Sequence, residues 1–273
     1  MVPVAAVCYT SAEMDATAFA KQTAIVVAEA ILLYMLSRLI FVWVLQSLAS
    51  RNPHARGGRL VQALRLPGNL VHELSHAAGY LIFGYTVRRM VPCIFDPRGR
   101  GSCQPGRPWS PIALPWLATG LAAIAPLLVG TLALRGAANM LAIDLDFAVL
   151  PHAGFADLLV NNIWANLQAL DFNAWQTYLF LYLAFSIGSE LAPSSTDVRR
   201  SIPALLSVGV GFIAAFVVLQ RLPADTPICQ LFTTHMDSAL GWLQTLLNFG
   251  ILTVALVAAI TAIPALLIRA ARQ

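Results

Sequence analysis

Long apolar segments separated by short polar stretches form the main pattern of this chain of 273 residues. An α-helix needs about 20 apolar residues to cross the hydrocarbon core of a bilayer. The pattern therefore predicts an all-α membrane protein with about six transmembrane helices. The expected spans are residues 23–48, 67–84, 111–134, 175–191, 202–222 and 240–268.

Polar and glycine-rich stretches indicate where these helices end. We expect the first helix to end at RNPHARGGR, residues 51–59, and the second to begin near Pro67 and to stop at Gly84. Residues 85–110 are rich in Pro, Gly and Arg and contain the turn signal DPRGRG, which predicts a hairpin or an irregular loop. The mixed stretch 136–173 predicts an amphipathic or interfacial helix, and residues 223–239 predict a loop.

Composition supports lipid as the solvent. The chain is 58% hydrophobic and 11% charged, whereas a soluble domain is about 25% charged. We expect a single membrane domain over residues 1–273 and no separate soluble module. Residues 1–20 lack the basic start of a signal peptide, so the first helix should remain as an anchor. The expected location is the cytoplasmic membrane of a prokaryote, as a multi-pass protein.

Arginines between the apolar segments indicate topology and argue against nucleic-acid binding. Lys21 is the only lysine, and residues 85–110 hold five arginines. If that loop is cytoplasmic, alternation places the stretch 136–173 outside. The four arginines of residues 51–65 would then also lie outside. Either the second helix is re-entrant or this loop breaks the rule, and the sequence leaves both alternatives open.

Residues 72–76 read HELSH, which matches the H-E-x-x-H pattern. On a helix, His72 and His76 lie on one face and can bind one metal ion, for which Zn²⁺ is the natural choice. Glu73 is placed to act as a general base. The alternative is a pair of hydrogen-bonded core histidines with Glu73 paired to an arginine. A charged group inside an apolar helix costs about 3 kcal/mol, so the membrane setting favours a functional site.

A catalytic zinc takes three protein ligands and keeps one position open, so a further ligand is expected. Asp197 is the first choice, because it follows a predicted span, and Glu190 is the rival. Asp197 could instead pair with Arg200 at a helix boundary. His152 and His235 are further possible ligands, although both are expected in external loops.

Smaller features point to structural roles. Glu29 could face the polar cavity of the site, but we expect it to lie at the membrane boundary. Asn161 and Asn162 could supply an oxyanion donor, but we expect them to be ordinary loop residues. The four cysteines form no C-x-x-C pair, so free thiols are expected. Cys93 and Cys103 could face each other across the predicted hairpin.

The segment HELSHAAGYLIFGYTV, the hairpin-like loop, a helix containing AIAPLLVG and a later span ending in APSSTD together resemble the site-2 protease family of intramembrane zinc metallopeptidases. The resemblance covers most of residues 67–200. It implies proteolysis within the membrane, with zinc bound by His72, His76 and Asp197, Glu73 as the base, and residues 85–108 as a membrane-associated β-hairpin. The best-known branch has Leu-Asp-Gly at the third ligand, whereas Asp197 follows Ser-Thr and precedes Val, which suits a divergent branch.

The leading hypothesis is a zinc peptidase that cleaves a membrane-embedded or membrane-adjacent protein or peptide. A second is a non-catalytic zinc-binding or structural subunit of a membrane complex. A third, a transporter with a proton path, is disfavoured because no duplicated half is visible.

Overall fold

The computed structural model describes residues 16–40, 56–92, 101–109, 114–145, 155–219, 221 and 226–270. Side chains are described in these ranges except at 16–18, 56–60, 155–159, 233 and 262–270. The expected end of the first helix after residue 40, most of the DPRGRG turn, Cys93 and His152 lie outside the described residues.

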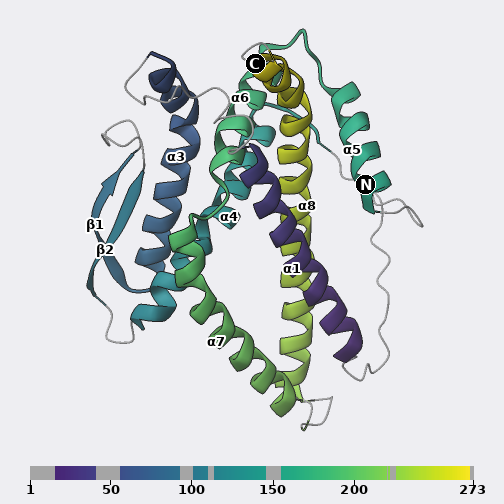
Figure 1. Ribbon diagram of the computed structural model, residues 1–273. Helices are drawn as coiled ribbons and strands as arrows, with labels where there is room; N and C mark the ends of the chain where they lie inside the picture. The colour runs from purple at the N-terminus through teal and green to yellow at the C-terminus, as the bar shows by residue number, and fades with distance from the viewer. Residues whose placement is uncertain are drawn as a thin grey trace.

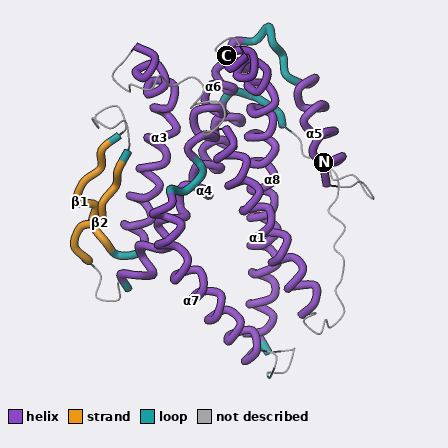
Figure 2. The backbone as a smooth tube through the Cα atoms, in the orientation of Figure 1, coloured by secondary structure: helices purple, strands orange, loops and turns teal. Residues whose placement is uncertain are grey.

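Helices form nearly all of the described structure, and one β-hairpin lies beside them (Figures 1 and 2). The predicted all-α membrane class is confirmed, and so is the hairpin. The elements are α1 (Ala16–Leu39), α3 (Arg56–Ile82), β1 (Tyr85–Val91), β2 (Ser102–Pro108), α4 (Pro115–Met140), α5 (Phe155–Ala169), α6 (Trp175–Glu190), α7 (Ser195–Leu219) and α8 (Pro227–Ala270).

Four described helices are long and apolar enough to cross a membrane, as expected of an integral membrane protein. They are Phe19–Leu39, Pro115–Met140, Ser195–Leu219 and Pro227–Thr261. Many of the apolar side chains of α7 are exposed in the isolated chain, as suits a helix that faces lipid. Neither α3 nor the 16-residue α6 is among the four. The count of about six spans stays a prediction.

Glycines bring α3 against two neighbouring helices. A Cβ atom added at Gly68 would lie 2.0 Å from the carbonyl oxygen of Ser186 on α6. One added at Gly79 would lie 2.8 Å from the Cα atom of Ala122 on α4. Only glycine permits such close backbone approaches. They fix the HELSH turns of α3 between α4 and α6.

The hairpin lies against α3 and follows it closely in the chain (Figure 1). Gly84 has a positive φ of 84°, the left-handed conformation that commonly ends a helix. The predicted stop at Gly84 is therefore confirmed. β1 and β2 pair in antiparallel orientation, with Arg89 opposite Gln104 and Val91 opposite Ser102.

A second packing centre joins α1, α6 and α8. Leu33, Phe180 and Ile251 are fully buried there. The prediction that Glu29 lies at the membrane boundary is wrong, because it sits in the middle of α1 and faces α8. The amide of Gln244 on α8 donates a hydrogen bond to Glu29 Oε1 at 3.2 Å.

Helices α3 and α8 both begin earlier in the chain than predicted. α3 begins at Arg56 and contains Pro67 within it. The N–H of Gly68 donates to Ser186 Oγ at 2.9 Å, so a neighbouring helix supplies a partner where proline disturbs the backbone ladder. α8 begins at Pro227, which suits a first helical turn.

As a consequence, residues 227–239 are helical and not a loop, since no glycine or further proline interrupts them. The helix expected within 136–173 is confirmed as α5. Asn162 lies on α5 and is buried, so its assignment to a loop is wrong.

Candidate metal centre

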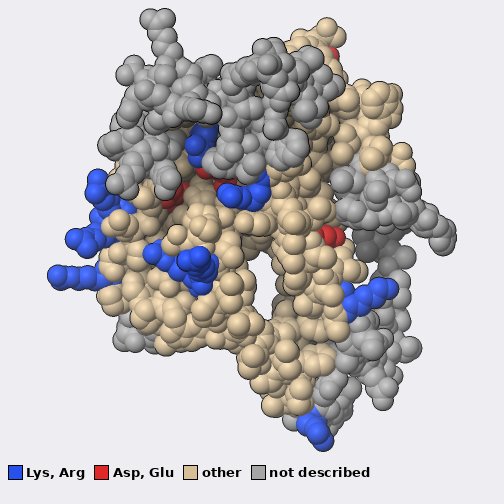
Figure 3. Space-filling view, viewed as in Figure 1, with Lys and Arg blue, Asp and Glu red and all other residues tan. Residues whose placement is uncertain are grey.

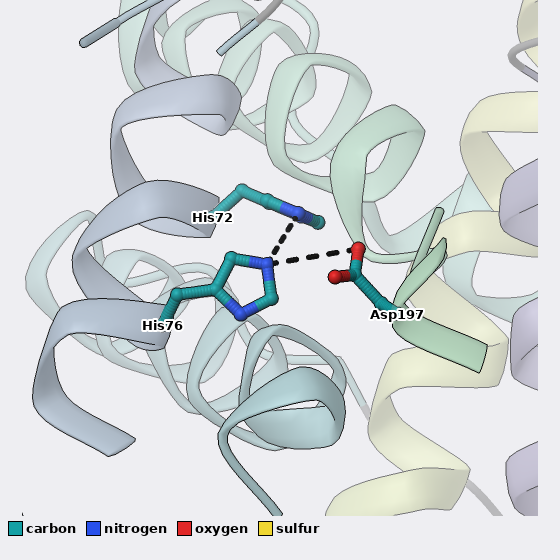
Figure 4. A group of neighbouring side chains, drawn as sticks. All are labelled: His72, His76 and Asp197. Carbon is teal, nitrogen blue, oxygen red and sulfur yellow. Dashed lines mark hydrogen bonds and ion pairs between the residues drawn. The ribbon is translucent and has the colours of Figure 1, made fainter. Parts of the chain in front are cut away.

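His72 and His76 project from successive turns of α3 toward Asp197 in the first turn of α7 (Figure 4). One ligand atom from each residue lies within 4.8 Å of the other two. His76 Nε2 is 3.1 Å from His72 Nε2 and 3.8 Å from Asp197 Oδ2. The structure thus brings together the three residues that the sequence and the resemblance propose as ligands.

Backbone carbonyls set the orientation of both imidazole rings. His72 Nδ1 lies 2.6 Å from the carbonyl oxygen of Glu190, and His76 Nδ1 lies 2.8 Å from that of Ala122. A carbonyl oxygen only accepts, so each Nδ1 carries a proton, and the neutral tautomer that this selects has its lone pair on Nε2. Two lone pairs then face each other across 3.1 Å. A proton or a metal ion bound to these atoms would remove the repulsion between the two lone pairs.

The donor set fits zinc. Tetrahedral Zn²⁺ with Zn–N distances of about 2.0–2.1 Å holds its donor atoms roughly 3.3–3.4 Å apart. The Nε2–Nε2 separation of 3.1 Å and the Nε2–Oδ2 separation of 3.8 Å lie on either side of that value, and the ligand atoms of His72 and Asp197 lie within 4.8 Å of each other. The Nδ1–H bonds to carbonyl oxygens are the outer contacts that ligand histidines usually make.

Asp197 is held by a capping box at the start of α7. The N–H of Ser194 donates to Asp197 Oδ2 at 3.0 Å, and the N–H of Asp197 donates to Ser194 Oγ at 3.2 Å. The Ser194 hydroxyl also donates to Oδ2. No ion pair joins Asp197 to Arg200 in the described part of the chain, so that alternative is not supported.

The start of α7 is brought to α4 by another glycine. A Cβ atom added at Gly120 would lie 2.3 Å from Ala204 Cβ and 2.8 Å from the Arg200 carbonyl oxygen. Gly120 lies about half a helical turn before Ala122, whose carbonyl holds His76. α4 therefore contacts α7 at Gly120 and holds His76 through the Ala122 carbonyl, and so positions both a histidine and the carboxylate opposite it.

Glu190, the rival third ligand, directs its carboxylate elsewhere. Oε1 of Glu190 forms an ion pair with Arg65 Nε on α3. Its carboxylate is not in the group of convergent ligand atoms. Glu190 instead contributes its main-chain carbonyl, which accepts from His72.

Glu73 is buried beside the three residues, with 4% of its surface exposed. Its Oε2 atom has no hydrogen-bond partner, and Glu73 forms no ion pair among the described residues. The alternative pairing with an arginine is therefore not supported. A Cβ atom added at Gly101, next to β2, would lie 2.2 Å from Glu73 Oε1 and 2.5 Å from Asn69 Nδ2. The hairpin therefore lies directly against the candidate base.

Sequence reasoning missed the other polar residues on this face of α3. Arg65, Asn69 and Tyr80 share the helical spacing of His72 and His76, and Asn69 and Tyr80 are both buried. Spacings of three and four residues were the available signal. This spacing can be interpreted only when it is known that this face of α3 points into the protein.

The other candidate ligand in the described part of the chain lies elsewhere. His235 is exposed on α8, not in a loop as predicted, and does not belong to the group.

Cys103 is a free thiol, as predicted. It is half-buried on the hairpin. Burial raises the pKa of this thiol to about 11, and the nearby Glu73 charge adds to the rise.

Figure 3 shows where acidic and basic side chains lie on one face of the protein. In the upper left part of this view, a few acidic atoms are visible between basic side chains. Arg88, Arg89 and Arg107 on the hairpin are all exposed.

Two imidazoles with matched tautomers, an anchored carboxylate and a buried carboxyl group form a site that can hold Zn²⁺ and accept a proton beside it. Comparison of the chain with protein families, curated proteins and solved structures finds no match.

Proposed function

We propose that the chain is a membrane zinc metallopeptidase that hydrolyses peptide bonds of membrane-embedded or membrane-adjacent substrates. The observation that carries the proposal is the meeting of two Nε2 lone pairs and a carboxylate beside Glu73. A structural histidine pair would need no third acidic group and no buried unpaired carboxyl group nearby. The same donors suit a divergent member of the site-2 protease family.

In this mechanism, His72, His76 and Asp197 hold the zinc ion. When bound, the ion supplies Lewis-acid polarisation of the scissile carbonyl. Glu73 accepts a proton from the attacking water and passes it to the departing amine. Burial of Glu73 among apolar helices excludes competing water, and its unpaired Oε2 is available for this proton.

The hairpin supplies a means of presenting substrate. A peptide inside a transmembrane helix must unwind before its carbonyl can reach the site. Extended segments bind by pairing with a strand edge, and a two-stranded sheet has an outer edge on each strand. Gly101 adjoins both β2 and Glu73, so an extended segment beside the hairpin would lie near the base.

The proposal places the chain in the cytoplasmic membrane of a prokaryote, with the arginine-bearing hairpin on the cytoplasmic side. Exposure of Arg88, Arg89 and Arg107 on the hairpin agrees with this orientation.

Glu73→Gln is the direct test. The substitution keeps the size of the side chain and removes its basicity. We expect purified protein in proteoliposomes to lose cleavage of a panel of single-span helices, detected by mass spectrometry, while zinc stays bound. Asp237→Asn, at an exposed site on α8, is the matched control and should cleave normally. Cleavage by the Glu73 variant at the wild-type rate would refute the mechanism. Zinc binding by a wild-type protein that cleaves no helix would favour a non-catalytic subunit.

A further inference from the structure

An ion pair joins α3 and α6 next to the metal centre. Arg65 Nε contacts Glu190 Oε1, and both side chains are largely buried. Glu190 is the last residue of α6, and its main-chain carbonyl accepts the Nδ1–H bond of His72. Glu190 therefore forms the ion pair with its side chain and orients the candidate ligand His72 with its main chain.

Glu190 is chemically suited to a different role. Carboxylates are good zinc ligands, and an additional one could fill the position that a catalytic zinc keeps open. The main chain of Glu190 already touches His72, and its charge acts on Glu73. Its carboxylate nevertheless lies outside the convergent group of ligand atoms. The contact that holds it there is the Arg65 guanidinium.

We propose that Arg65 is a positioning residue that keeps the Glu190 carboxylate off the metal, so that the coordination position needed for substrate stays open. This inference rests on the proposed zinc function. The guanidinium stays charged at all working pH values, so the restraint is permanent. Without Arg65, a buried carboxylate lacks its cation and gains most by turning toward the metal.

A purely structural ion pair and this restraint predict different metal coordination in the Arg65 variant. If the pair only joins α3 to α6, Arg65→Gln and Glu190→Gln each weaken the protein, because each leaves a buried charge unpaired, and neither changes how the folded chain holds a metal ion. If Arg65 restrains a competing ligand, Arg65→Gln closes the site and Glu190→Gln is tolerated. Removing both charges should then reopen the site, because no carboxylate remains to bind.

The test uses full-length protein loaded with Co²⁺, whose visible absorption reports the number and geometry of its ligands. We expect Arg65→Gln to retain one metal ion per chain, to change the absorption spectrum and to cleave at least tenfold more slowly. Arg65→Gln/Glu190→Gln should restore the wild-type spectrum and most of the cleavage. Arg221→Gln, at an exposed residue after α7, is the control and should match wild type.

An unchanged spectrum in folded Arg65→Gln protein, or a double variant as impaired as the single, would overturn the inference. If Arg65→Gln alone fails to fold, the double variant decides. A wild-type spectrum with cleavage supports the restraint, whereas loss of both refutes it. Failure of the proposed function looks different, since wild-type protein would then show no Co²⁺ spectrum that depends on His72 and Asp197.

Discussion

Gly101→Ala tests whether the hairpin sets the position of the candidate base. The added methyl carbon would lie 2.2 Å from Glu73 Oε1, with the two side-chain amide atoms of Asn69 at 2.5 and 2.8 Å. Favourable contacts between heavy atoms begin at roughly 3.5 Å. Glu73 or the hairpin must therefore move by about 1 Å, taking that contact distance as the limit.

Gly101→Ala should slow the reaction more than it lowers the stability of the protein. The atoms nearest the new methyl group are the ends of two side chains, which can rotate away, so we expect less than the roughly 1–3 kcal/mol of an overpacked core. Displacement of a reacting group by about 1 Å can cost on the order of 100-fold in rate. His72, His76 and Asp197 are not among the nearest atoms, so zinc should remain.

The assay compares cleavage of single-span helices in proteoliposomes, zinc content and thermal unfolding for Gly101→Ala and Gly136→Ala. A methyl group at Gly136 meets no atom within 4 Å, which makes it the matched control. We expect cleavage to fall about 100-fold only at Gly101, from the cost of displacing a catalytic group. Cleavage at the wild-type rate would refute the placement of Glu73 as the base beneath the hairpin. Loss of zinc would show that the hairpin supports the ligands instead.

Gly79→Ala should lower the free energy of unfolding by about 1–3 kcal/mol, because the new methyl group meets the backbone of α4; Gly211→Ala, in open space, should not. Thermal unfolding in detergent micelles checks both, and equal effects would contradict the packing of α3. In a variant in which the other three cysteines are replaced, Cys103 should react with maleimide at pH 8 about a hundredfold more slowly than an ordinary thiol of pKa near 8.5. The reason is that burial raises the pKa of Cys103 to about 11. The rate should rise steeply up to about pH 11, and rapid labelling at pH 8 would contradict this burial. Ser194→Ala should weaken zinc binding about 10-fold or more by releasing Asp197, as measured by competition with a chelator; unchanged affinity would show that the capping box does not orient the ligand.

The parts of the site that local spacing fixes could be predicted from the sequence. His72 and His76 share one face because they are four residues apart on a single helix, and Gly84 ends that helix through its positive φ. The hairpin followed from its turn residues. Each of these features depends on neighbours in the sequence.

The remaining parts depend on contacts between distant helices. Asp197 was predicted as the third ligand from its place after a predicted span and from the resemblance, but no pattern within α4 or α7 reveals the contact at Gly120 that brings the two helices together. The pairing of Arg65 with Glu190 spans 125 residues and was missed for the same reason. α3 continues through Pro67 because Ser186 on α6 offers a hydrogen-bond partner there.

Zinc content of the purified protein tests the central claim most directly. We expect one zinc per chain in wild-type protein and in the exposed-site controls His235→Ala and Asp237→Asn, with zinc lost in His72→Ala, His76→Ala and Asp197→Ala. A folded wild-type protein without zinc, or one that keeps its zinc after any of the last three substitutions, would contradict the account.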